Sequence, residues 1–345
     1  MYIATMIVIF LAVMIWMWHK DYKGYLLIPI LFSMVFSAFM VFMYVAAKDS
    51  QGGDVMVLNG HVTKKFSQRT SCSHSYSCNC RIVQNGKSTT TKCDTCYEHP
   101  YDVDWVVKSN VGSAEIDRIN RQGTKEPPRF TQAYIGEPFS IEMDYYNYIK
   151  ASPLSVFKDY HTFKNVLTPS YPKVYDYYRI KHVVDYNSEW RGQFEVIDNY
   201  LAHKLKYSSA KTKANVVVIF YGKEDIREAM RVKNYGGRIN DLTVMIQAAE
   251  DGTIKNAYVF SWSKSDMVNI LLRDDILDMK NMNGSQKKLV DSIDNILVKY
   301  YTHRSMEDFK YLEHNIQMPM WYYVGTILGM LLVLGFNLFI VRDLR

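Results

Sequence analysis

The chain has 345 residues, of which 48% are hydrophobic and 22% are charged, and its formal net charge is +6. This excess is small for the length, and charges of both signs are interspersed, so the sequence gives no indication of nucleic-acid binding. The mean hydropathy of -0.18 excludes a protein made mostly of membrane-spanning helices. The apolar residues are nevertheless concentrated in three blocks.

These uncharged blocks cover residues 2–18, 25–47 and 320–341. A helix over the second block would be about 34 Å long, enough to cross a hydrocarbon core of about 30 Å. We therefore predict three transmembrane helices, two near the N-terminus and one near the C-terminus. The first block is the shortest, and cleavage after the second block, at the small residues Val45 and Ala47, is an alternative.

The short loop 19–24 and the tail 342–345 are both net basic. The positive-inside rule places both in the cytoplasm, so residues 48–318 are expected on the extracytoplasmic side of a multi-pass membrane protein. Gly325 and Gly329 in the last block form a small-xxx-small pair, which would allow a homo-oligomer through that helix.

All five cysteines lie in one segment of 25 residues: Cys72, Cys78, Cys80, Cys93 and Cys96. Within this segment Asn85 and Gly86 separate two runs that contain Thr and Val. The pattern is typical of a β-hairpin, because Asn and Gly tolerate the positive φ angles of a tight turn. A hairpin centred there brings the first two hairpin cysteines opposite the last two.

Two chemistries fit this arrangement. Disulfides require an oxidising compartment, which the predicted topology supplies. A zinc site would instead use four thiolates (Cys78, Cys80, Cys93, Cys96), with Cys72, His74 or His99 as alternates. The Cys-x-Cys spacing is shorter than zinc sites usually show, so the sequence favours disulfides; free thiols or a redox-active Cys93-x-x-Cys96 are further alternatives. Because five is odd, one thiol is left over, paired between chains or held by a metal.

Two strand signals flank the cysteines. Residues 55–58 precede Asn59 and Gly60, which predicts a second hairpin. In residues 97–108 acidic and apolar side chains alternate, which predicts a strand with one solvated face. A cation site is the alternative for this strand, formed by Glu98, His99, Asp102 and Asp104.

From Val183 onwards the pattern changes to alternating helices and strands. Residues 215–221 read NVVVIFY, a buried strand, and residues 241–249 and 253–262 form a hairpin. The predicted helices are one capped by Ser188 and two at residues 265–279 and 285–301. The first has an apolar stripe of Trp190, Phe194, Ile197, Leu201 and Leu205. These elements indicate an α/β layer.

The predicted fold class is therefore α+β or α/β, with transmembrane helices on both sides of the folded region. We divide the chain into a transmembrane hairpin, a β-rich region with the cysteines, an α/β domain, and a final helix with its tail. Their bounds are residues 1–47, 48–180, 181–315 and 319–345.

The order of elements from Val183 to about Leu312 resembles the TPM domain family, in particular at residues 216–219 and 240–246. This resemblance implies a membrane-anchored extracytoplasmic α/β domain. Where that family carries a glycine-rich acidic segment, this chain has residues 259–265, and of the family's acidic positions only Asp241 matches. Residues 93–105 also resemble uncharacterised membrane proteins of large tailed bacteriophages, which implies a phage protein in a bacterial inner membrane.

The sequence contains none of the common catalytic motifs, so we expect a non-enzymatic binding or scaffolding protein with the bilayer and an unidentified protein as partners. One alternative is a metal-dependent, phosphatase-like hydrolase in the α/β domain, which would use Asp225, Asp241 and Asp251. The other is a structural zinc module in the cysteine segment. No cofactor other than zinc is expected.

Overall fold

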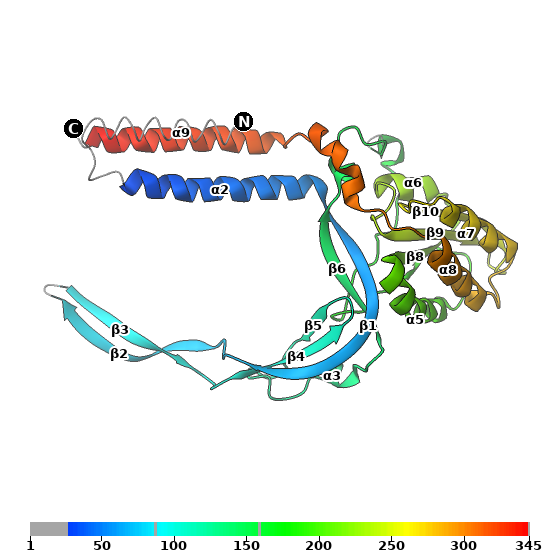
Figure 1. The fold of residues 1–345 in the computed structure, drawn as a ribbon, viewed down its shortest axis with the longest axis horizontal. Coiled ribbons are helices and arrows are strands. Elements are labelled where there is room, and N and C mark those ends of the chain that lie inside the picture. Colours follow the sequence, from blue (N-terminus) through cyan, green and yellow to red (C-terminus); the bar gives the residue numbers. More distant parts are fainter. Residues whose placement is uncertain (1–26, 86–87, 158–159, 344–345) are drawn as a thin grey trace. The chain divides into compact units, whose positions relative to one another are not determined.

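The computed structural model describes residues 27–85, 88–157 and 160–343, and these residues form two compact units (Figure 1). The first unit contains the described parts of residues 1–54, 145–158 and 306–345. The second contains the described parts of residues 55–144 and 159–305. The first apolar block, residues 2–18, and the loop 19–24 lie outside the described residues.

Two helices that run side by side form most of the first unit, α2 (Leu27–Gly52) and α9 (Met320–Asp343) (Figure 1). Met40 and Ala47 of α2 are buried with Tyr322 of α9 in a small apolar core. The short helix α4 (Tyr148–Ala151) lies against α2 and against the 3-10 segment η3 (Met306–Asn315). A part of the apolar side chains of α2 and α9 is thus used in contacts between the two helices.

Among the described residues, no single helix is long and apolar enough to cross a membrane. One bent pair, Met306–Asn315 with Met320–Val333, meets the test by length and composition, but its two parts differ in direction by 61°. The prediction of three transmembrane helices is therefore wrong, and so is the multi-pass location that was built on it. Apolar composition misled the prediction because it does not report that α2 and α9 pack on each other through a part of their apolar side chains.

The second unit begins with a four-stranded antiparallel sheet of strand order β5-β4-β1-β6. Its strands are β1 (Gly53–Thr70), β4 (Asp102–Ser109), β5 (Ser113–Ile116) and β6 (Pro138–Tyr146). Val62, Val107 and Phe139 form its core with Phe130 of the short helix α3 (Pro128–Gln132) and with Tyr178, whose ring stacks on that of Phe139.

The hairpin predicted at Asn59 and Gly60 does not exist, because β1 continues through both residues. Asn59 is 3% exposed and hydrogen-bonds other buried side chains. A Cβ atom at Gly60 would collide with the side chain of Asn110. That side chain accepts a hydrogen bond from the backbone N–H of His61 at 2.8 Å. The Asn-Gly pair therefore serves buried hydrogen bonding and close approach instead of a turn.

A second four-stranded sheet, of order β10-β9-β8-β7, carries the α/β layer. Strands β7 (Val183–Tyr186), β8 (Asn215–Tyr221) and β9 (Asp241–Ala248) are parallel, and β10 (Ile254–Ser261) is antiparallel to β9. The helices of this layer are α5 (Phe194–Thr212), α6 (Arg227–Lys233), α7 (Met267–Asp278) and α8 (Gln286–Tyr300). The short segment η2 (Tyr160–Phe163) lies against α6.

Alternate residues of β8 and β9 enter two separate cores, as the pleat of a strand requires. On one face Val218 and Val244 pack with α5, α7 and α8, and on the other Ile219 and Met245 pack with Met230 of α6. The predicted buried strand at residues 215–221, the β9–β10 hairpin and the last two helices are confirmed. Ser188, however, does not cap a helix, because α5 begins six residues later, at Phe194.

A buried polar chain joins the two sheets of the second unit. Ser140 of β6 donates to Asn59 of β1 at 2.7 Å, and Asn59 donates to Asn215 of β8 at 2.9 Å. Asn215 in turn donates to Asp241 at the start of β9, at 2.9 Å. All four side chains are at most 4% exposed, so this chain connects the sheets in the interior of the unit.

Candidate functional site

The cysteine segment forms the predicted hairpin. Strand β2 (Ser75–Asn85) pairs antiparallel with β3 (Ser88–Tyr97), and Asn85 lies opposite Ser88. Disulfides join Cys78 to Cys96 and Cys80 to Cys93, while Cys72 stays a free thiol. The disulfide prediction is confirmed. The four hairpin cysteines are therefore not available as zinc thiolates.

The hairpin buries little of its side-chain surface. Ile82 is 74% exposed, Tyr97 is 57% exposed and Tyr76 is 53% exposed. Strands β2 and β3 pair with each other and, within the described part of the chain, with no third strand. The two disulfides therefore stabilise an element that has almost no apolar core of its own.

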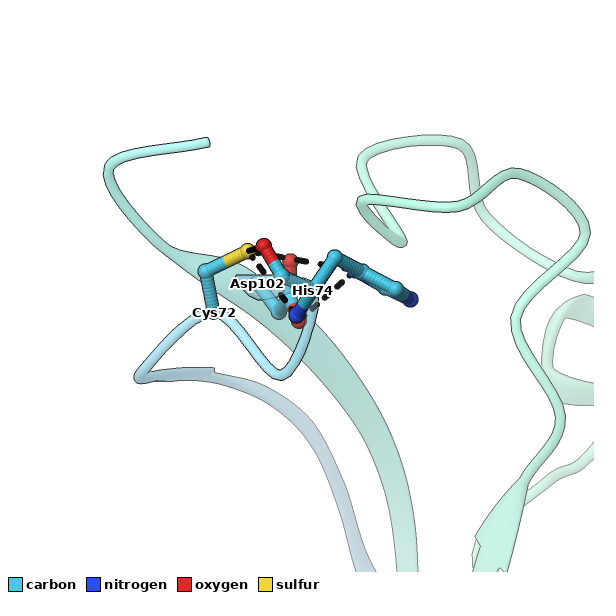
Figure 2. Close-up of side chains that lie close together, drawn as sticks. All are labelled: Cys72, His74 and Asp102. Carbon is cyan, nitrogen blue, oxygen red and sulfur yellow. Dashed lines mark hydrogen bonds and ion pairs between the residues drawn. The ribbon is translucent and has the colours of Figure 1, made fainter. Parts of the chain in front are cut away.

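A second group of polar side chains gathers where the hairpin joins the first sheet. Cys72 and His74 lie between β1 and β2, and Asp102 begins β4. Figure 2 shows their side chains converging on one another. The Sγ atom of Cys72 lies 3.8 Å from Nδ1 of His74, and Nδ1 lies 3.6 Å from Oδ2 of Asp102. We call these three residues the hairpin-base cluster.

The carboxylate of Asp102 is fully buried and is held by three donors. Its Oδ2 atom accepts hydrogen bonds from the backbone N–H of Ser73 at 2.9 Å and the hydroxyl of Ser73 at 3.2 Å, and it pairs with Arg118 at 2.8 Å. The Ser73 N–H, together with Arg118, lowers the pKa of Asp102 to about 2. The other oxygen, Oδ1, is buried and has no hydrogen-bond partner.

The solvated strand face predicted for Asp102 and Asp104 is wrong, because both carboxylates bind Arg118. Arg118 follows β5 in the sequence, and nothing in the sequence indicated that it would pair with β4. Burial and the nearby charge of Asp104 raise the pKa of Glu115, which lies next to this pair. Two buried or half-buried aspartates thus share one guanidinium.

His99 and Glu98 lie beside the hairpin-base cluster. Ligand atoms of both residues and of His74 lie within 4.8 Å of one another, and the rings of His74 and His99 are 6.1 Å apart. Arg121 pairs with Glu98 at 2.7 Å. An open pocket of about 580 Å³ borders the group and is lined by Ser73, His74, Glu115 and the loop 117–121. Of the predicted cation residues, only Glu98 and His99 therefore come together, beside His74, whereas Asp102 belongs to the hairpin-base cluster and Asp104 binds Arg118.

The hairpin-base cluster does not have the geometry of a Cys-His-Asp catalytic triad. In a triad the nucleophile and the carboxylate bind opposite nitrogens of the imidazole. Here both Cys72 and Asp102 approach the same nitrogen, Nδ1 of His74. The thiol is also 7% exposed, so a substrate has little access to it.

The carboxylates proposed for a hydrolase are not gathered in one place. Asp241 pairs with Asn215 at the start of parallel strands β8 and β9, whereas Asp225 follows the end of β8. A strand of seven residues is about 20 Å long, so these two carboxylates cannot share an ion. Asp225 instead binds Arg227, and Asp251 binds the backbone and hydroxyl of Thr253 in the β9–β10 turn.

Gly325 and Gly329 face α2 of the same chain. A Cβ atom at Gly329 would collide with the ring of Phe36, and one at Gly325 would touch Met43. The small residues therefore allow α9 to approach α2 closely. A homo-oligomer through this face would have to displace α2.

Comparisons with known proteins find no relative of this chain. No protein-family model, no curated protein and no solved structure matches the chain. The resemblances to the TPM domain family and to phage membrane proteins therefore stay predictions.

Proposed function

We propose that the chain is a non-catalytic binding protein that contacts a protein partner through the hairpin β2–β3. The observation that carries this proposal is that an exposed two-stranded element contains two disulfides. An isolated hairpin is at best marginally stable in water. The two cross-links hold the hairpin in a fixed shape, although the hairpin adds no buried core to the fold. A fixed exposed surface is best explained by recognition of another molecule.

The surface of the hairpin suits a protein partner. Its strands present backbone N–H and C=O groups that can pair with a strand of another chain. Its exposed side chains include Tyr76, Ile82 and Tyr97, of the aromatic and aliphatic kinds that anchor protein interfaces. Arg81 and Asp94 lie 4.0 Å apart, so the charge of the surface is mixed. A mixed surface favours a protein over a polyanion.

The test is site-specific photo-crosslinking in the cells that naturally produce the chain. A photoreactive residue in place of Ile82 should give one discrete adduct with a second protein. The matched control is the same residue in place of Val298 on α8, which is 50% exposed and belongs to the same unit. Adduct formation from position 82 should fall at least about fivefold in a Cys80→Ala/Cys93→Ala background, because the hairpin then loses its fixed shape.

Two results would contradict the proposal. One is an adduct that forms equally well from positions 82 and 298, since contact would then not depend on the hairpin. The other is the lack of any adduct from position 82 while mass spectrometry shows both disulfides intact.

A further inference from the structure

We propose that Cys72, His74 and Asp102 bind one zinc ion at the base of the hairpin. The site is separate from the disulfides and does not depend on the recognition role proposed above. The ligand atoms would be Sγ of Cys72, Nδ1 of His74 and Oδ1 of Asp102, and water would complete the coordination.

The distances match the separation of ligand atoms around zinc. With Zn–S about 2.3 Å and Zn–N about 2.0 Å, two atoms of a tetrahedral site lie about 3.5 Å apart. The observed separations are 3.8 Å between Sγ of Cys72 and Nδ1 of His74, and 3.6 Å between that nitrogen and Oδ2 of Asp102, the other oxygen of the carboxylate that offers Oδ1. One ligand atom from each of the three residues lies within 4.8 Å of the other two. Cys72 and Asp102 both approach Nδ1 of His74. This arrangement argues against a triad, but it is the one expected if all three side chains bind the same ion.

An independent observation points to a ligand here. The side chain of Asp102 is fully buried, and its Oδ1 atom has no hydrogen-bond partner. A buried carboxylate oxygen without a partner is costly, and such atoms in native proteins call for an explanation. Oδ2 is already saturated by Ser73 and Arg118. Oδ1 is therefore the oxygen with free lone pairs, and a bound cation would satisfy it.

The charges around the cluster also favour a cation. Asp102 and Asp104 carry two negative charges against the single positive charge of Arg118. A thiolate at Cys72 would bring the negative charges to three. One divalent ion together with Arg118 balances these three charges, and this offsets the repulsion between the ion and the guanidinium.

The ligand types select the metal. Thiolate and imidazole together favour zinc over calcium or magnesium, which prefer oxygen ligands only. Because Cys72 and His74 precede β2 while Asp102 begins β4, the ion would connect the base of the hairpin directly to the first sheet. The ion would also bind Cys72, the one cysteine that forms no disulfide in the hairpin.

The test uses the full chain, purified without chelator or reductant so that the disulfides remain. Elemental analysis should find about one zinc per chain. After removal of zinc, titration with Co²⁺ should give the thiolate-to-cobalt charge-transfer absorption. Cys72→Ser should abolish that absorption, and His74→Gln should weaken metal binding at least about 100-fold, since loss of a direct ligand costs more than loss of its supporting contacts. The matched control His61→Gln, a half-buried histidine of β1 away from the cluster, should bind as the parent chain does.

Disulfide mapping by mass spectrometry shows for each variant that the hairpin is folded. The proposal is overturned if the parent chain, with both disulfides formed, binds no Zn²⁺ or Co²⁺ at micromolar concentration. It is equally overturned if Cys72→Ser keeps the charge-transfer absorption, or if His61→Gln and His74→Gln weaken binding by the same factor.

Discussion

The sheet β7–β10 and the hairpin β2–β3 are both β structure, but different forces stabilise them. Every residue of β8 is buried, and helices cover both faces of its sheet. The hairpin leaves large side chains such as Ile82 exposed and carries both disulfides of the chain. Hydrophobic burial stabilises the first element, and cross-links take over where burial is absent.

The largest effect is expected in the core of the α/β layer. Leu201 of α5 is fully buried, so Leu201→Ala should lower the free energy of unfolding by about 2–5 kcal/mol, through lost burial and the cavity left behind. Ile82→Ala in the hairpin should change it by less than about 0.5 kcal/mol. Chemical denaturation of both variants measures the difference. Equal effects would show that the hairpin has an apolar core after all.

Removal of one cross-link should affect the hairpin alone. The Cys80–Cys93 disulfide has a sequence separation of 13, and closing a loop of that size contributes about 3 kcal/mol in the chain-entropy account. In Cys80→Ala/Cys93→Ala, amide hydrogen exchange of residues 75–97 should rise while β8 stays protected. Exchange in the hairpin at the parent rate would mean that strand pairing alone holds it.

An intermediate effect is expected at the polar chain that joins the two sheets. Asn59→Ala leaves Ser140 and Asn215 with an unpaired buried group each, which should cost about 1–3 kcal/mol of unfolding free energy. Ser140→Ala should cost less, because it removes one donor only. The double variant should cost less than the sum of the two single ones, as measured by denaturation. Strict additivity would contradict the contact.

Asp102 should make the stability of the protein depend on pH in the acidic range. Its pKa is about 2 in the folded protein, against about 3.9 when unfolded. The ionised carboxylate therefore stabilises the fold above about pH 4, and this contribution is lost as the pH falls towards 2. In denaturation with chelator present, the parent chain should exceed Asp102→Asn in stability at pH 5, and the gap should narrow by pH 2. A gap that does not depend on pH would contradict the assignment.

The α/β layer was predictable because its signals are local. The run NVVVIFY at residues 215–221 and the amphipathic pattern of residues 285–301 each report burial along a single element. The hairpin was predictable for the same reason, since the pair Asn-Gly at residues 85–86 is a local turn signal in the sequence and two cysteines lie on each side of it.

The errors arose where a residue's role depends on a distant partner. Asn59 and Gly60 have the composition of a turn, but their roles are set by Asn215 and Asn110. Asp102 lies in a run of alternating acidic and apolar residues that predicts a solvated side chain, but Arg118 and Ser73 bind its carboxylate in a buried position. The cluster of Cys72, His74 and Asp102 was foreseen only in pieces, since its members lie on both sides of the hairpin. The apolar blocks gave wrong spans because composition does not report which helix lies beside which.

The placement of the disulfides has a consequence for proteolysis. Both disulfides cross from β2 to β3, so a protease that cuts the connection between Asn85 and Ser88 would not separate the chain into two pieces. The nicked protein would keep its full mass on a non-reducing gel, apart from one added water, and would fall into two fragments only after reduction. The hairpin can thus be cleaved between its two strands without the loss of either half.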